Sequence, residues 1–122
     1  MARVLVVDDD PDTAETFVRL LASWGHRAEP CLCGPAALAL AAAFRPDVAL
    51  VDLSMPGLGG ASVARLLARG LGLRPRLLAM TGLPPALVPA ADAAVFDRVL
   101  YKPVEPAELR ALVAGAVHQE QP

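Results

Sequence analysis

Short apolar runs that end in polar or charged residues recur along the chain, and longer segments with helical spacing separate them. Runs this short, bounded by Pro, Gly or acidic residues, are typical of strands buried on both faces of a sheet. We expect strands at 3–7, 27–31, 48–52, 75–80 and 99–101. The second is the weakest, because Pro30 cannot donate to a strand ladder, so we expect it to be short or to lie at an edge.

Helical patterns fill most of the intervening segments. The first helix is expected to start at Pro11, with Asp10 as its N-cap, and to end at Gly25. Further helices are predicted at 34–44, from residue 60 or 61 to about 71, and from 106 onward. In the last two helices the expected core-facing residues are Val63, Leu66, Leu67, Leu109, Leu112, Val113, Ala116 and Val117, and Arg65 and Arg69 face solvent.

Prolines at 84, 85 and 89 interrupt the segment between the fourth and fifth strands, where the alternating pattern requires a helix. Pro85 is compatible with a first helical turn, but Pro89 would then lie inside that helix and remove a backbone hydrogen bond. We therefore expect a short, kinked or late-starting helix between Thr81 and Val99, with Pro89 near its start as the second option.

Strands that alternate with helices throughout predict an α/β fold, in which helices cover both faces of a parallel sheet and the crossovers are right-handed. The 122 residues are enough for one domain and too few for two. We expect one domain over 1–122, with an ordered core at about 2–117 and a frayed polar tail from His118 to Pro122.

Composition narrows the class of protein. Hydrophobic residues make up 55% of the chain and aromatic residues 4%, so we expect a core of Ala, Leu and Val. The net charge of -2 offers no basic surface to nucleic acid, and the longest apolar run, 36–44, is too short to span a membrane. Cys31 and Cys33 lie too close together for an ordinary structural disulfide, which favours reduced thiols in a cytoplasmic protein.

The candidate chemistry lies at the carboxyl ends of the predicted strands. Acids 8–10 follow the first strand, Asp52 ends the third, Thr81 follows the fourth and Lys102 follows the fifth. In a parallel sheet these ends meet at one edge, where ligands bind. Clustered carboxylates repel one another and raise each other's pKa, a conflict that a hard divalent cation with oxygen ligands, such as Mg²⁺, resolves.

Asp52 is central to this cluster, because an acid at the end of a buried strand requires compensation. We expect the compensation to come from a magnesium ion and a lysine. A carboxylate can attack phosphorus to form an aspartyl phosphate, and a metal, an ammonium group and a hydroxyl are suitable partners for phosphoryl oxygens. Our hypothesis is that the protein exists to be phosphorylated on Asp52.

Four motifs, VLVVDDD, VALVDLSMPGLGG, LLAMTG and YKPV, together resemble the receiver domain of bacterial response regulators. Each motif alone is weak, but the four in this order are specific, and the resemblance covers essentially the whole chain. It implies a doubly wound, flavodoxin-like fold with five parallel strands in the order 2-1-3-4-5.

The resemblance also implies roles for the acids. Asp52 matches the phosphoacceptor, Asp9 the principal magnesium-binding acid, and Asp8 its neighbour, which often acts through water. Ser54 matches the position whose backbone carbonyl ligates the metal, so the implied metal ligands are Asp8, Asp9, Asp52 and Ser54.

Three further positions match the family's phosphoryl-binding groups. Thr81 matches the switch hydroxyl that moves to bond the phosphoryl group, and Gly82 the small residue that leaves this group room. Lys102 matches the family's lysine, and the bond from this lysine to the following proline, here Pro103, is often cis in the family.

One position departs from the family pattern. Receivers usually carry Tyr or Phe three residues before the lysine, where its ring swings inward on activation, and here that residue is Val99. Tyr101 immediately precedes Lys102 and faces the same way as Val99 by strand alternation. Whether Tyr101 replaces the missing ring stays open.

The implied function is a signalling module and not an enzyme with its own substrate. A phosphohistidine on a sensor histidine kinase or a histidine phosphotransfer protein would donate the phosphoryl group, docking on the first helix near Ala14, Phe17 and Val18. Phosphorylation would switch a surface that binds a downstream effector. Such a receiver either stands alone or belongs to a larger protein, such as a hybrid histidine kinase.

Two other functions fit parts of the sequence. A magnesium-dependent phosphatase of the haloacid-dehalogenase type also uses Asp, Thr and Lys, but Asp12 stands where that family requires Thr or Val. A phosphorylation-independent interaction module would explain Val99 and the prolines, and the complete set of acids with Thr81 and Lys102 argues against it.

Overall fold

The computed structural model describes residues 1–55, 59–70 and 74–119, and side chains in the last of these ranges as far as residue 116. Its five strands are β1 (Arg3–Val7), β2 (Arg27–Cys31), β3 (Val48–Asp52), β4 (Arg76–Thr81) and β5 (Arg98–Tyr101). All neighbouring strands pair in parallel, in the order β2-β1-β3-β4-β5. This confirms the predicted α/β class and strand order.

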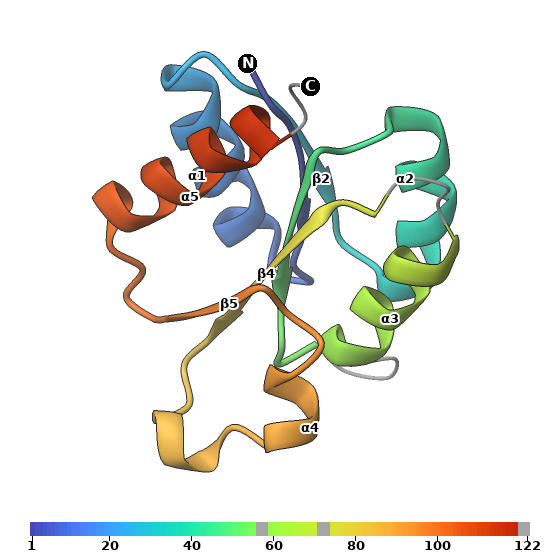
Figure 1. Ribbon diagram of the computed structural model, residues 1–122, viewed down its shortest axis with the longest axis vertical. Coiled ribbons are helices and arrows are strands. Elements are labelled where there is room, and N and C mark those ends of the chain that lie inside the picture. The colour runs from blue at the N-terminus through green and yellow to red at the C-terminus, as the bar shows by residue number, and fades with distance from the viewer. Residues whose placement is uncertain (56–58, 71–73, 120–122) are drawn as a thin grey trace.

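Helices cover both faces of the sheet (Figure 1). The helices are α1 (Pro11–Ser23), α2 (Ala37–Phe44), α3 (Gly60–Gly70), α4 (Ala90–Ala93) and α5 (Pro106–Gln119), and short 3₁₀ turns occur at Gly34–Ala36 and Pro85–Leu87. In Figure 1, α1 and α5 lie on one side of the strands and α2 and α3 on the other. The segment with the second 3₁₀ turn and α4 extends below the sheet in that view.

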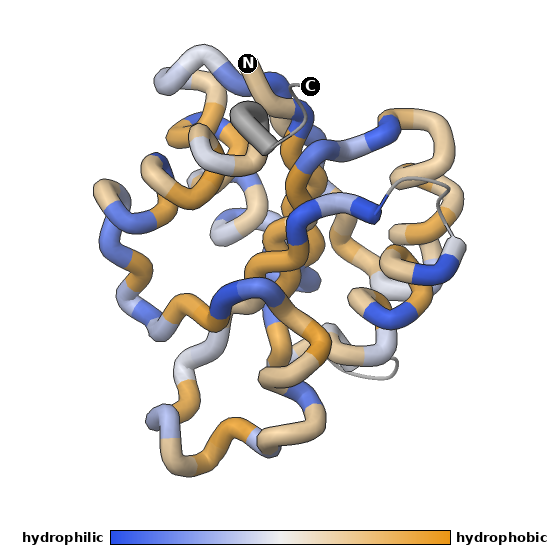
Figure 2. Tube along the Cα trace, in the orientation of Figure 1, coloured by the Kyte–Doolittle hydropathy of each residue, from blue (hydrophilic) through white to orange (hydrophobic). Residues whose placement is uncertain are grey.

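The core divides into two clusters because successive side chains of a strand point to opposite faces. Leu5, Ala49 and Leu77 pack on the α2 and α3 side, and Leu50 and Leu78 pack on the α1 and α5 side. Each fully buried Leu or Val contributes roughly 1.5–3 kcal/mol to stability. Figure 2 shows that the central strands are coloured as hydrophobic.

The start of α1 agrees with its predicted N-cap. The carboxylate of Asp10 accepts hydrogen bonds from the Thr13 hydroxyl at 2.7 Å and the Asp12 amide at 3.2 Å. The Thr13 hydroxyl, followed by the Asp12 amide, holds the pKa of Asp10 below its usual range. Gly25 follows the helix with a left-handed φ of +88°, which glycine adopts without steric cost.

One predicted side-chain orientation is wrong, and one residue named for the docking surface is buried. Leu66 is 37% exposed and not in the core, because at about 100° per residue it lies outside the buried face of α3. That face consists of Gly60, Ala61, Val63, Ala64 and Leu67. Ala14 is fully buried against the α1 and α5 cluster, so it offers no docking surface on the first helix. Leu109 and Val113 are buried as predicted, and Leu112 is half-buried.

The boundaries of several elements differ from the predictions by a residue or a few. The strand β4 covers 76–81, β5 begins at Arg98, and a 3₁₀ turn precedes α2. The proline-rich segment forms a 3₁₀ turn from Pro85 and a four-residue α4 with Pro89 at its N-cap. The helix is thus short and starts late, and the option with Pro89 near its start is confirmed. Helix α5 continues through His118 and Gln119, which the sequence analysis placed in a frayed tail. The predictions for Leu71, the Val117 side chain and the rest of the tail, 120–122, lie outside the described residues.

Candidate functional site

Asp52 ends the central strand β3, which pairs with β1 on one side and β4 on the other. All five residues of β3 are buried, and the Asp52 side chain is only 7% exposed. Its Oδ1 accepts a hydrogen bond from the Ser54 amide at 2.9 Å, and its Oδ2 lies 3.4 Å from the Nζ of Lys102. The carboxylate is therefore held by its own backbone on one side and faces a cation on the other.

Two acids from the end of β1 lie beside Asp52. Carboxylate oxygens of Asp8, Asp9 and Asp52 all lie within 4.8 Å of one another, with Asp8 buried and Asp9 exposed. The Asp8 amide donates to the carbonyl oxygen of Cys31 at 3.0 Å, so the last residue of β2 helps to hold this acid in place. Strands β1 and β3 are neighbours in the sheet, so their carboxyl ends bring the three acids together, as the sequence predicted.

The Asp8 carboxylate has a buried oxygen without a hydrogen-bond partner among the described residues. Its Oδ1 accepts from the Asp10 amide at 3.0 Å, but its buried Oδ2 has no hydrogen-bond partner among the described residues. Burial raises the pKa of Asp8, and the Asp52 charge adds to this effect, against the Asp10 amide and Lys102, which lower it. A buried acceptor left without a partner costs about 1–3 kcal/mol.

This donor set fits a hard divalent cation. Mg²⁺ prefers oxygen ligands, keeps several waters and is commonly held by one or two carboxylates. A cation at this point would give the free Oδ2 of Asp8 a partner and offset the repulsion among Asp8, Asp9 and Asp52. Ser54 lies two residues after Asp52 and is exposed. Its amide donates the hydrogen bond to Asp52 Oδ1.

Lys102 reaches the site from the end of β5. Its amide donates to the carbonyl oxygen of Thr81 at 2.8 Å, which extends the pairing of β4 and β5 by one residue. Its side chain is 34% exposed, so the ammonium group reaches Asp52 and also stays in contact with solvent. The peptide bond to Pro103 is cis.

Thr81 is fully buried at the end of β4. Its Oγ1 accepts a hydrogen bond from the Leu83 amide at 3.0 Å, so in this structure the hydroxyl holds the loop that leads to α4. Gly82, between them, is exposed, and a Cβ atom there would meet no described atom within 4 Å.

Val99, which stands where the family usually has an aromatic residue, and Tyr101 have different environments in β5. Val99 pairs with Ala79 and is half-buried against the α2 and α3 cluster. Tyr101 pairs with Thr81, two residues further along the strand, and is 39% exposed.

Gly60 is a site residue that the sequence analysis treated only as a possible helix start. It is buried beside the backbone of Asp52 and Leu53. A glycine at the start of a helix was the only signal in the sequence, and that signal does not reveal which backbone lies against it.

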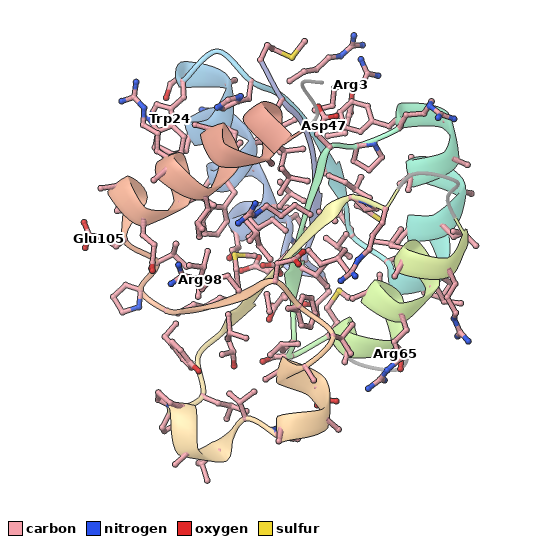
Figure 3. The ribbon with its side chains drawn as sticks, viewed as in Figure 1. Arg3, Trp24, Asp47, Arg65, Arg98 and Glu105 are labelled. Carbon is pink, nitrogen blue, oxygen red and sulfur yellow. The ribbon has the colours of Figure 1, made fainter. Side chains whose placement is uncertain are left out.

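The far end of the sheet is built differently. Arg3 and Asp47 exchange two hydrogen bonds there, from the Arg3 amide to an Asp47 carboxylate oxygen at 2.8 Å and from the Asp47 amide to the Arg3 carbonyl at 2.7 Å. Figure 3 shows both residues at the end of the molecule opposite α4.

None of the helices in the described residues combines the length and the hydrophobicity that a membrane span requires.

Comparison with known proteins agrees with the fold. The model of the response regulator receiver domain family matches residues 4–114. The chain is 33% identical over 119 residues to the DNA-binding response regulator MtrA of Mycolicibacterium smegmatis. The matched region covers 98% of this chain and 52% of MtrA. It is 39% identical over 69 residues to the protein PilH of Pseudomonas aeruginosa, which covers 57% of each chain.

A solved structure supports the same assignment. The CheY-like response regulator receiver domain from Methylobacillus flagellatus superposes with a TM-score of 0.85 and 26% sequence identity, over 95% of this chain and 98% of that one. The chain thus belongs to the response regulator receiver domain family, and its setting is two-component signalling. It spans about half the length of the curated relatives that it matches, 52% of MtrA and 57% of PilH.

Proposed function

We propose that this receiver accepts a phosphoryl group on Asp52 from a phosphohistidine. The observation that carries the proposal is the setting of the Asp52 carboxylate, which lies 3.4 Å from Lys102 Nζ, with oxygens of Asp8 and Asp9 within 4.8 Å. A carboxylate oxygen of Asp52 attacks phosphorus and forms an O–P bond. The P–N bond of the donor breaks, and its electron pair stays on the imidazole nitrogen.

The residues around Asp52 have separate tasks in this reaction. Asp8, Asp9 and Asp52 would hold Mg²⁺ with the Ser54 carbonyl, and the bound ion supplies positive charge that offsets the charge on the phosphoryl oxygens. Lys102 binds a phosphoryl oxygen with the ammonium group that now faces Asp52 Oδ2. The burial of Asp52 limits the access of water to its carboxyl carbon.

Thr81 connects this chemistry to the loop after β4. Its hydroxyl accepts a hydrogen bond from the Leu83 amide at 3.0 Å, and a hydroxyl that accepts in this way still has its own hydrogen to donate to a phosphoryl oxygen. When Thr81 moves toward the phosphoryl group, the Leu83 amide bonded to it moves as well, and the loop toward α4 and the surface presented to an effector change.

The phosphodonor is a sensor histidine kinase or a histidine phosphotransfer protein. Its docking surface on α1 includes Phe17 and Val18, which are half-buried and leave part of their apolar surface exposed, whereas Ala14 does not contribute. Helix α1 begins at Pro11, directly after the acids that follow β1, so this docking surface and the acidic cluster lie on adjoining segments of the chain.

Intact mass spectrometry tests the proposal. Wild type, Asp52→Asn and the control Asp12→Asn are incubated with acetyl phosphate or phosphoramidate, with and without Mg²⁺; Asp12 is an exposed acid in the first turn of α1. We expect one base-labile phosphoryl group in wild type and in the control when Mg²⁺ is present, and none in Asp52→Asn.

A second candidate is an interaction module that does not use phosphorylation. The observation that favours it is the exposed Tyr101 beside Thr81, with Val99 where an inward-swinging ring is expected. Absence of a phosphoryl adduct and of beryllofluoride binding in wild type would overturn the proposed function and support this candidate instead.

A further inference from the structure

Gly60, the first residue of α3, lies directly against the end of β3. A Cβ atom on Gly60 would overlap the backbone carbonyl oxygen of Asp52, and it would lie 2.9 Å from the Asp52 carbonyl carbon and 2.9 Å from the Cα of Leu53. Cβ atoms essentially never come within 3.0 Å of heavy atoms that belong to residues not adjacent in the chain. This position therefore has no room for any side chain.

Backbone conformation does not explain the glycine. Among the described glycines only Gly25 has a left-handed φ, and Gly60 begins a helix in a conformation that any residue can adopt. The requirement at Gly60 is for space alone. The three nearest atoms that a Cβ atom would meet all belong to backbone, so no rotation of a neighbouring side chain can relieve this overlap.

Both sides of this contact are fixed to the rest of the fold. The Leu53 amide donates to the carbonyl oxygen of Met80 at 2.9 Å, and Asp52 pairs with Met80 between β3 and β4. On the helix side, Val63 and Leu67 are buried in the core. A side chain at position 60 has to displace either the Asp52–Leu53 peptide or the first turn of α3.

The Asp52–Leu53 peptide also sets the direction of the reacting carboxylate. The hydrogen bond from the Ser54 amide to Asp52 Oδ1, 2.9 Å long, closes a turn that includes this peptide. A displaced peptide therefore turns the carboxylate away from Lys102 and from the other acids. Misplacement of a reacting group by about 1 Å can slow a reaction about a hundredfold.

We infer that Gly60 is a positioning residue for phosphoryl acceptance. By carrying no side chain, it lets α3 approach the carbonyl of Asp52 and keeps the Asp52–Ser54 turn in its reactive geometry. The inference rests on the proposed function, because it concerns the rate at which Asp52 is phosphorylated.

Gly60→Ala tests the inference, and Gly59→Ala is the matched control. A Cβ atom on Gly59 would meet no described atom within 4 Å, although Gly59 is the neighbouring residue. Three quantities are measured for both variants and wild type: the amide proton shift of Ser54 by NMR without metal, the dissociation constant for Mg²⁺, and the rate of phosphorylation by phosphoramidate per folded molecule.

For Gly60→Ala we expect the Ser54 amide to lose its hydrogen-bonded shift, Mg²⁺ binding to weaken, and phosphorylation to slow by about tenfold to a hundredfold. Gly59→Ala should match wild type in all three. A folded Gly60→Ala protein with a lower melting temperature but wild-type Ser54 shift, Mg²⁺ affinity and rate would overturn the inference, since the glycine would then serve packing only.

Two further outcomes are also decisive. If Gly60→Ala does not fold, the measurements are repeated in a stabilising osmolyte; failure to fold there, where Gly59→Ala folds, overturns the inference in favour of a folding role. If wild type itself takes no phosphoryl group, the proposed function fails and the inference fails with it. If wild type is phosphorylated and Gly60→Ala matches it in all three quantities, the inference about Gly60 is overturned and the proposed function stands.

Discussion

The Nζ of Lys102 lies 3.4 Å from Oδ2 of Asp52 and joins the carboxyl ends of β5 and β3 across the intervening strand β4. The pair is asymmetric, because the carboxylate is almost fully buried and about a third of the lysine side chain is exposed. Lys102 is thus the cation that links the acidic cluster to the solvent-facing edge of the site.

Replacing Lys102 by Met should affect chemistry more than stability. Without metal, stability should fall by about 1 kcal/mol or less, because solvent screens a partly exposed pair, and saturating Mg²⁺ should restore part of the loss. Phosphorylation by phosphoramidate should slow by about tenfold or more, because a phosphoryl oxygen loses its charged partner. Urea unfolding with and without Mg²⁺, together with phosphorylation rates, checks both; an unchanged rate would contradict the role assigned to Lys102.

Mg²⁺ should stabilise the wild-type fold. At a concentration ten times its dissociation constant, a ligand that binds only the folded state adds about 1.4 kcal/mol to the free energy of unfolding. Asp8→Asn should lose most of this increase and should be at least as stable as wild type without metal, because it removes a buried charge from the cluster. Denaturant unfolding with and without Mg²⁺ measures both, and Asp12→Asn should respond like wild type.

Acidification should weaken the fold through His26. The Nδ1 of His26 accepts a hydrogen bond from the Ala2 amide at 3.0 Å, and burial, followed by the N-terminal ammonium and Arg110, lowers its pKa below 6.5. The unfolded chain takes up the proton first, so this contribution is complete above about pH 6.5 and is lost as the pH falls toward the folded pKa. Urea unfolding between pH 7.5 and 5 should show the loss, and His26→Asn should lack the part due to this residue.

Gly115→Ala should stabilise the protein. Gly115 lies inside α5, and a Cβ atom there would meet no described atom within 4 Å. Alanine in place of an interior helical glycine gains roughly 0.5–1 kcal/mol, because the unfolded chain has less freedom to lose. A rise in melting temperature checks this prediction, and a fall would mean that α5 is packed more tightly at this point than the structure indicates.

Arg65→Gln should loosen α4. Arg65 reaches from α3 to α4, where its Nη2 donates to the Ala91 carbonyl at 3.4 Å and lies 3.8 Å from Asp92 Oδ1, and Figure 3 shows it beside these two helices. Because α4 has no buried residue, these polar contacts are prominent among its attachments. Amide exchange at Ala93 and Ala94 should quicken, with a change in global stability below about 1 kcal/mol. Arg69→Gln, an exposed change on the same helix, should leave α4 exchange unchanged.

The sequence is sufficient to predict the sheet and the place of the acids. The strands β1 and β3 are buried on both faces, so they appear in the sequence as short apolar runs, and parallel strands bring Asp8 and Asp52 to the same edge. The prolines likewise indicate a shortened α4, because Pro89 cannot lie inside a helix.

The errors and omissions have a common physical cause, which is that packing depends on residues far away in the sequence. Leu66 and Ala14 are both apolar helix residues, and only the fold determines that the first is exposed and the second buried. The contact of Gly60 with the Asp52 backbone likewise depends on how the elements pack in space. The same holds for the hydrogen bond that the Thr81 hydroxyl accepts from the Leu83 amide.

Pro30 in β2 has a consequence for association between copies of the domain. The strand lies at the edge of the sheet, and Pro30 has no amide hydrogen to offer to a further strand, while Arg27 and Glu29 add exposed charge along the same edge. Proline and charge on an edge strand prevent two sheets from joining into one. The β2 edge is thereby protected against strand-to-strand aggregation, which leaves β5 as the sheet edge where a further strand could pair.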